Sequence, residues 1–380
     1  FAMRIMGIWL LLIAQPPVAV AAGAARSFTD MQGETAAAAP GQPAAGPGGA
    51  DYAHADITMF HFGRGNGEYW IFEPAAPVPD SAPVIIFSHG WAAMYPKMYG
   101  AWIRHLVLKG NIVIYPRYQA NVMQRPPEMW RAARDAVRAA FAELQKPGHV
   151  RPDLERVAAA GHSFGGVMTA NWASVWAREG VPRVKAAMPV QPGDTEAGDS
   201  PRAEPGRFGS IREDYAGMDP QTRLIVLAGE DDRIVGQGAA RFIFEHAVSL
   251  PAHNKSYILM LTDMHGTPPL VADHFQPLSG DPVLDYANEA APERTDSIIA
   301  KWKQSGKAAH EDRGGPYARL APDAHDFAMW RLFDALCDCA FYGNNCEQSL
   351  GSGPGALGLG QWSDGTPVKP LNYGDTILNY

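Results

Sequence analysis

The sequence predicts an α/β fold in which a mostly parallel sheet is covered by helices on both faces. Short apolar runs that end in glycine, such as 82–90 (APVIIFSHG) and 222–229 (TRLIVLAG), are typical of strands buried on both faces. Amphipathic segments of helical period lie between such runs, as in 126–145. Strands and helices that alternate at this spacing indicate a parallel sheet, whose ligand site lies beyond the carboxyl ends of the strands.

The elements follow in chain order. Residues 57–63 and 67–74 predict a hairpin that turns at Gly65, Asn66 and Gly67. Further strands are predicted at 82–90, 111–118, 156–161, 184–190, 222–229 and 255–262. Helices are predicted at 98–110, 126–145, 164–180, 236–250 and 326–343. An irregular closing segment is expected at 355–374, around Trp362.

The amino-terminal part of the chain predicts export. Residues 1–25 have the layout of a signal peptide, because the apolar run IMGIWLLLIA follows Met3 and Arg4 and precedes small residues suited to cleavage. A membrane anchor is the alternative, but the run is shorter than the ~20 residues that a span needs. Residues 26–51 are rich in Ala, Gly and Pro and predict a disordered linker. We expect one domain over 52–380, with a covering segment from about 278, in a secreted or periplasmic protein.

Composition and charge exclude several classes of partner. The chain has 380 residues, of which 46% are hydrophobic, so it can bury a large core. Its formal net charge is −8 and it has no block of basic residues, which argues against nucleic acid and anionic membrane surfaces as partners. We expect a monomer without a stable membrane span.

The segment GHSFGG places Ser163 between Gly161 and Gly165. A serine with this spacing of glycines can arise by chance, so the surrounding segments decide its meaning. A predicted strand precedes it and a predicted helix follows it, which is the setting of a serine nucleophile on a tight turn. We therefore predict that Ser163 is the nucleophile.

A serine nucleophile needs a base and a carboxylate that orients the base. The loop after the strand at 222–229 offers Asp231 and Asp232, and we favour Asp232 because of its spacing between Gly229 and Val235. The alternative is that both residues only cap the next helix.

Two histidines follow the strand at 255–262. His265 comes soon after the strand and before Gly266, which leaves room for its ring, so we predict that His265 is the base. His274 lies beyond a double proline and is expected to have a structural role.

The order Ser, Asp, His resembles that of the α/β-hydrolase superfamily, on the segments GHSFGG, GEDDRIV and DMHG. The resemblance covers residues 52–277. It implies an oxyanion hole formed by the backbone amides of Phe164 and Trp91. Within the superfamily, the secretion signal and the HGW segment resemble secreted esterases of the lipase, cutinase, polyester hydrolase and platelet-activating-factor acetylhydrolase group.

Aromatic residues in the loops after the strands indicate the substrate. We expect Trp91, Tyr95 and Tyr118 to bind a neutral apolar ester, such as a lipid, an aryl ester or a polyester. The ester would be cleaved through an acyl-enzyme, and no metal or organic cofactor is implied. Two alternatives stay open: an acyltransferase, peptidase or cofactor-free peroxidase on the same triad, and a binding protein that keeps the fold without the chemistry.

The three cysteines lie near the carboxyl terminus. An exported chain meets an oxidising compartment, so one local disulfide is expected. Cys339 with Cys346 is the favoured pair and Cys337 with Cys346 is the alternative, which leaves one free thiol. A zinc site would need a fourth ligand, and none is obvious nearby.

Overall fold

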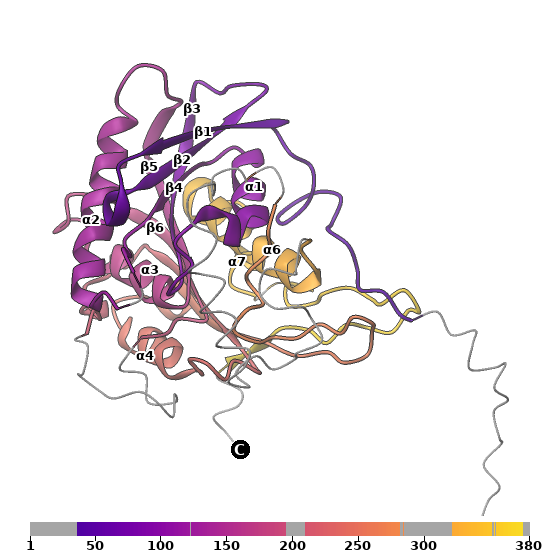
Figure 1. Cartoon of the computed structure of the whole chain (residues 1–380). Coiled ribbons are helices and arrows are strands. Elements are labelled where there is room, and N and C mark those ends of the chain that lie inside the picture. Colours follow the sequence, from indigo (N-terminus) through magenta and orange to yellow (C-terminus); the bar gives the residue numbers. More distant parts are fainter. Residues whose placement is uncertain are drawn as a thin grey trace, which may run out of the picture. The chain divides into compact units, whose positions relative to one another are not determined.

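The computed structural model describes residues 36–121, 123–194, 210–281, 284, 321–351, 353 and 355–374. The predicted signal peptide and the first part of the predicted linker lie outside these residues. The described chain forms one mixed sheet with helices on both of its faces (Figure 1). The predicted fold class is therefore confirmed.

The strands of the sheet lie in the order β1-β2-β4-β3-β5-β6-β7-β8-β9. Their bounds are β1 (Asp56–Phe62), β2 (Tyr69–Ala75), β3 (Ser81–Ser88), β4 (Ile112–Pro116), β5 (Arg151–His162), β6 (Val184–Val190), β7 (Arg223–Gly229), β8 (Lys255–Met260) and β9 (Asn372–Tyr373). The strands from β4 to β8 in this order pair in parallel, whereas β1, β2 and β9 pair antiparallel at the two edges. The carboxyl ends of the parallel strands therefore meet along one edge of the sheet.

The helices lie in two layers. Those of the described residues are α1 (Gly100–Leu108), α2 (Pro126–Glu143), α3 (Phe164–Val175), α4 (Gly238–His246), α6 (Ala324–Tyr342) and α7 (Cys346–Ser349). Helices α2, α3 and α4 pack on one face of the sheet and α1 and α6 on the other, as Figure 1 shows. Among the described residues, no helix combines the length and the apolar character that crossing a membrane requires.

The central strands supply side chains to both layers. In β3, Val84 and Ile86 pack toward α2 and α3, whereas Ile85 and Phe87 pack toward α1 and α6. Alternate side chains of a strand point to opposite faces, so a strand covered on both faces must be apolar at every position. This requirement explains why the buried strands are continuous apolar runs in the sequence.

Residues 37–51 correct the prediction of a disordered linker over 26–51. The backbone N–H of Gly48 donates to Asp334 in α6 at 2.7 Å. Ala38 exchanges hydrogen bonds with Ser363, and the carbonyl of Ala37 accepts from the backbone N–H of Thr267. This segment buries little side-chain surface of its own, and distant parts of the chain satisfy its backbone groups instead, which composition alone does not reveal.

The carboxyl-terminal segment packs on the same core. Helix α6 begins at a capping box formed by Asp323 and Asp326. Trp330 and Phe333 of α6 are buried against the sheet face that α1 also covers. Trp362 of the closing segment is only 2% exposed, and β9 then adds a short strand beside β8.

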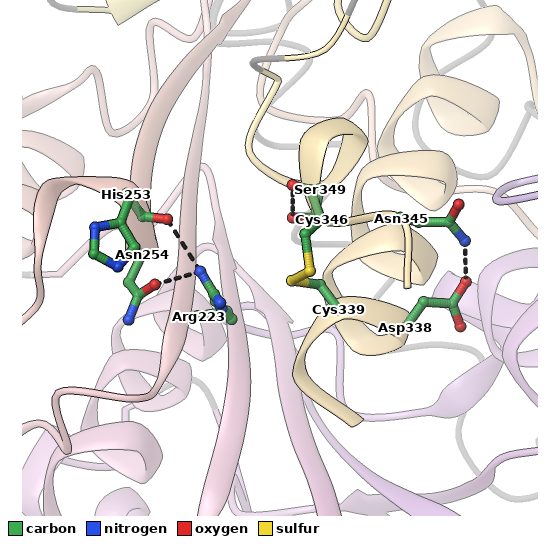
Figure 2. The surroundings of a disulfide bond; sticks show 8 residues. All are labelled: Arg223, His253, Asn254, Asp338, Cys339, Asn345, Cys346 and Ser349. Atoms are coloured by element: carbon green, nitrogen blue, oxygen red, sulfur yellow. Dashed lines mark hydrogen bonds between the residues drawn. A yellow bond between two sulfur atoms is a disulfide. The ribbon is translucent and has the colours of Figure 1, made fainter. Parts of the chain in front are cut away.

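A disulfide joins Cys339 of α6 to Cys346 of α7 (Figure 2). Cys337 is a buried free thiol. The favoured pairing is therefore confirmed. The bond closes the turn between the two helices, where the side-chain amide of Asn345 also donates to Asp338 at 2.8 Å.

We expect the unfolded, unreduced protein to titrate as one free thiol. The disulfide closes a short loop, and in the chain-entropy model a loop of this length contributes about 2–3 kcal/mol to the free energy of unfolding. A Cys339→Ser, Cys346→Ser double variant should therefore unfold at lower denaturant concentration. Cys337→Ser is the matched control for the thiol count, which should fall to zero. Three thiols in the unreduced wild-type protein would refute the bond.

Candidate active site

Ser163 lies on a sharp turn between β5 and α3. Its backbone has φ 58° and ψ −124°, which is strained for a residue with a side chain. The two glycines make the turn fit: a Cβ at Gly165 would overlap the carbonyl oxygen of Ser88, and one at Gly161 would lie 2.6 Å from the same atom. The turn therefore presents the Ser163 hydroxyl at the carboxyl end of β5.

His274 and Asp232 complete a hydrogen-bonded line with Ser163. The Nε2 atom of His274 lies 2.9 Å from Ser163 Oγ, and its Nδ1 atom lies 2.7 Å from Asp232 Oδ2. The three residues follow β5, β7 and β8 along the chain, in the order serine, aspartate, histidine. All three residues are buried, at 7%, 6% and 5% exposure for Ser163, Asp232 and His274.

The prediction that His265 is the partner of Ser163 is wrong. The Nε2 atom of His265 lies 2.7 Å from Asp364 Oδ2, and both side chains are exposed. The pKa of Asp364 is lowered to about 2 by the backbone N–H of Thr366 and by His265. His274, which we expected to be structural, occupies the position beside the serine.

The loop after β8 explains the error. Asp263 and Leu270 form an antiparallel bridge, so the chain runs outward past His265 and then returns toward the sheet. Gly266 does not make room for a histidine ring; a Cβ there would overlap the ring of Trp362. The sequence carries two histidines in the loop, and only the bridge decides which of them faces the serine.

Asp232 holds the turn after β7 and faces His274, but it does not cap the next helix, whose N-cap residue is Gln237. Its Oδ1 atom accepts from the backbone N–H groups of Ile234 and Val235, at 3.0 and 3.1 Å, while Oδ2 faces His274. Asp231 is engaged elsewhere, because its Oδ2 accepts from the hydroxyl of Thr262 at 2.6 Å. The turn thus fixes the position of the Asp232 carboxylate beside His274.

The two residues of the predicted oxyanion hole lie beside Ser163. Phe164 is the first residue of α3, so its backbone N–H has no acceptor within the helix. Trp91 follows β3, and its ring meets the ring of Phe164 edge to face at 5.7 Å. The next amide, that of Ala92, donates to Gln119 Oε1 at 2.7 Å, which holds the loop in place.

A cavity of about 210 Å³ opens in front of Ser163. Apolar side chains form most of its lining: Trp91, Met98, Ile234, Val235, Phe275 and Leu278. Asp194 also lines it, and its carboxylate pairs with the Arg212 guanidinium at 2.6 and 3.0 Å. The sequence did not predict Asp194 or Val235 as lining residues, because their loops approach Ser163 only in the folded chain.

Two predicted substrate-binding residues lie outside this lining. Tyr118 is fully buried, and its hydroxyl donates to the carbonyl of His89. Tyr95 lies under the guanidinium of Arg117, 5.0 Å from the ring centre. The prediction that both line the substrate site is therefore wrong for this cavity, whereas Trp91 does line it.

Two buried histidines next to the site are held neutral. Burial lowers the pKa of His89 to about 3, although the backbone of Gly90 works in the opposite direction. Burial, together with the nearby His274, also puts the pKa of His162 well below its ordinary value. Both rings therefore act as neutral hydrogen-bonding groups.

We expect the free energy of unfolding to fall as the pH is lowered from about 6.5 to about 3. In this range an unfolded His89 binds a proton that the native residue does not bind, so protonation favours the unfolded state, by at most ~1.4 kcal/mol per pH unit for one group. Denaturant unfolding measured at several pH values gives the slope. His89→Asn, whose amide can still donate to Gly90, should flatten it, and an unchanged slope in this variant would contradict the prediction.

No group of three or more His, Cys, Asp or Glu side chains in the described part of the chain is arranged to hold a metal ion. The chemistry that the site residues themselves can perform is attack by an activated hydroxyl on an electrophilic carbon, with the histidine as base.

Comparison with known proteins gives one family. Residues 70–192 match the model of the chlorophyllase family, an α/β-hydrolase-like serine esterase family. The match covers less than half of the chain and includes the Trp91 loop and Ser163, but it ends before Asp232 and His274. A search of curated proteins found no match. The fold and this similarity together identify the chain as an α/β-hydrolase of the serine hydrolase type.

Proposed function

We propose that the protein is an exported esterase that cleaves neutral carboxylic esters through an acyl-enzyme. The observation that carries the proposal is the line of hydrogen bonds from Ser163 through His274 to Asp232 at an apolar cavity. The similarity to a serine esterase family over 70–192 supports it. The predicted signal peptide and the disulfide support export.

Acylation begins when the Ser163 hydroxyl attacks the ester carbonyl carbon. His274 Nε2 takes the hydroxyl proton, and Asp232 stabilises the imidazolium that forms. The carbonyl oxygen becomes an oxyanion, which the amides of Phe164 and Trp91 bind. When the tetrahedral intermediate collapses, His274 gives the proton to the leaving alcohol and the acyl group stays on Ser163.

Deacylation repeats these steps with water. His274 removes a proton from a water molecule that attacks the acyl carbon, and the oxyanion forms at the same two amides. Collapse releases the carboxylic acid and returns the proton from His274 to Ser163 Oγ. The sum is one ester and one water converted to one acid and one alcohol.

The cavity supports a preference for apolar groups of modest size. Its lining is mostly apolar, and its volume of about 210 Å³ suits an acyl or aryl group rather than a whole large ligand. The Asp194 carboxylate, although paired with Arg212, disfavours an anionic acyl group at the same wall. A lipid or polyester would place one ester unit at the site and leave the rest outside.

A panel of p-nitrophenyl esters of rising acyl length, run beside a peptide p-nitroanilide and a polyester film, tests the reaction class. We expect the neutral esters to be cleaved much faster than the anilide, and short to medium chains faster than a succinyl ester. Faster cleavage of the anilide would indicate a peptidase. Product that accumulates only with an added alcohol would indicate an acyltransferase.

Labelling with a fluorophosphonate probe tests the nucleophile. We expect stoichiometric labelling, with the probe on the peptide that contains Ser163, because only an activated serine reacts readily. Ser174, whose hydroxyl donates to the carbonyl of Asp214, is the internal control and should stay unlabelled. Absence of labelling would favour a binding protein with a hydrolase fold.

A further inference from the structure

A buried tyrosine hydroxyl holds the loop that carries Trp91. Tyr99 has no exposed surface, and its Oη atom accepts from the backbone N–H of Gly90 at 2.9 Å. The same Oη lies 3.0 Å from His162 Nδ1. Gly90 lies between these groups: a Cβ there would lie 3.1 Å from Tyr99 Oη and 3.2 Å from both His162 Nδ1 and Ser163 Cβ.

Two consecutive peptide units of this loop are fixed by hydrogen bonds. The carbonyl of Gly90 accepts from His89 Nδ1 at 2.7 Å and from the backbone N–H of Ala93 at 3.0 Å. Because a peptide unit is planar and trans, fixing this carbonyl also fixes the direction of the Trp91 N–H in the same unit. Tyr99 fixes the preceding unit, whose N–H belongs to Gly90.

Glycine makes this support necessary. Gly90 lacks a Cβ and can rotate into other backbone conformations at little steric cost. Without the hydroxyl of Tyr99, its buried N–H would have to find another acceptor, and rotation about Gly90 would turn the Trp91 amide as well. A hydrogen-bond partner therefore replaces the steric restraint that a side chain would provide.

His162 connects this loop to the loop of the catalytic histidine. It is 3% exposed and directly precedes Ser163. Its other ring nitrogen, Nε2, is buried, and the His162 ring also interacts with the backbone of His274 and the side chain of Gln191. The amide of Gln191 in turn donates to the carbonyl of Asp273 at 2.7 Å.

We propose that Tyr99 and His162 are positioning residues, which hold the Gly90 peptide so that the Trp91 amide points at the reacting carbonyl oxygen. Neither residue touches the substrate's reacting atoms in this role; both act through the backbone of the loop. The inference rests on the proposed esterase function, and its effect is confined to stabilisation of the oxyanion.

Tyr99→Phe tests the proposal, because it removes the hydroxyl and keeps the ring. We expect kcat for an oxygen ester to fall by about 10–100-fold with little change in KM, since a displaced donor is lost mainly in the transition state. A matched thionoester supplies the decisive readout. Its sulfur is a poor hydrogen-bond acceptor and gains little from the oxyanion amides, so the ratio of oxygen-ester to thionoester rates should fall in the variant.

Tyr215→Phe is the matched control for loss of a buried tyrosine hydroxyl. Tyr215 is 1% exposed and its hydroxyl donates to Asn171 Oδ1 at 3.1 Å. We expect a lower free energy of unfolding in this variant but an unchanged ratio of oxygen-ester to thionoester rates. An equal fall in both rates for Tyr99→Phe, with the ratio retained, would show a merely structural role and overturn the proposal.

Two substitutions of His162 test the second residue. In His162→Asn the new side-chain amide would lie near the place of Nδ1, so this variant should retain most of the rate ratio, whereas His162→Leu should lose it. Equal ratios in the two variants would overturn the role of His162. If instead fluorophosphonate labelling and ester cleavage do not depend on Ser163, the proposed function itself fails, which separates the two outcomes.

Discussion

Ser163→Ala and His274→Ala are each expected to lower kcat for ester hydrolysis by ~10⁶-fold, and the double variant by no more than either alone. The serine hydroxyl is weakly nucleophilic without the base, and the base has nothing to activate without the serine. Their side chains are joined by a hydrogen bond of 2.9 Å, so they act as one unit. Initial rates on p-nitrophenyl butyrate, with an active-site titration of the wild-type protein, measure the effect.

His265→Ala is the matched control for the histidine. Its ring pairs with Asp364 on the surface, and exposed ion pairs contribute little to stability. We therefore expect kcat to change by less than about twofold. A large loss in His265→Ala together with a small loss in His274→Ala would contradict the assignment of the base. Additive losses in the double variant would contradict joint action of serine and histidine.

Asp232→Asn is expected to lower kcat by about 10⁴-fold while the protein stays folded. The asparagine oxygen can still accept from the backbone N–H groups of Ile234 and Val235, so the turn is retained. The amide nitrogen would then face His274 Nδ1 and donate to it, which leaves the proton on Nε2. His274 in that tautomer cannot accept the Ser163 proton.

Asp231→Asn is the control, since this neighbouring carboxylate accepts from Thr262 and does not contact His274. We expect it to keep most of the activity. Circular dichroism and thermal unfolding would establish that both variants are folded. A larger loss of kcat in Asp231→Asn than in Asp232→Asn would mean that the carboxylate has been assigned to the wrong residue.

Much of the architecture follows from local pattern. The hairpin of β1 and β2, the apolar strands from β3 to β8 and the amphipathic α2 are set by periodicity and by turn residues, and the structure confirms them. The pairing of Cys339 with Cys346 was also predictable, because the two residues flank a short turn. The ordered conformation of residues 37–51 was not predictable, because it depends on hydrogen bonds to Asp334 and Ser363, which lie far along the chain.

The residues of the site also differ in how far the sequence predicts them. GHSFGG predicted Ser163 as the nucleophile because the glycines that a tight turn requires lie close to the serine in the sequence. The loop after β7 supplied Asp232 for a similar reason. The histidine that faces Ser163 could not be predicted in this way. His265 and His274 lie in one loop, and the choice between them depends on the bridge between Asp263 and Leu270 and on the packing of Gly266 against Trp362.

The sequence by itself determined the order of strands and helices along the chain and the serine turn, and it favoured Asp232 over Asp231, because these depend on residues that are neighbours in the chain. Only the tertiary structure decided which histidine faces Ser163, which aromatic residues line the cavity, and that Tyr99 reaches Gly90. Those features arise where a loop folds back or where separate elements pack together. The physical reason is that a side chain's direction is set by the backbone path and by distant contacts, neither of which a local pattern records.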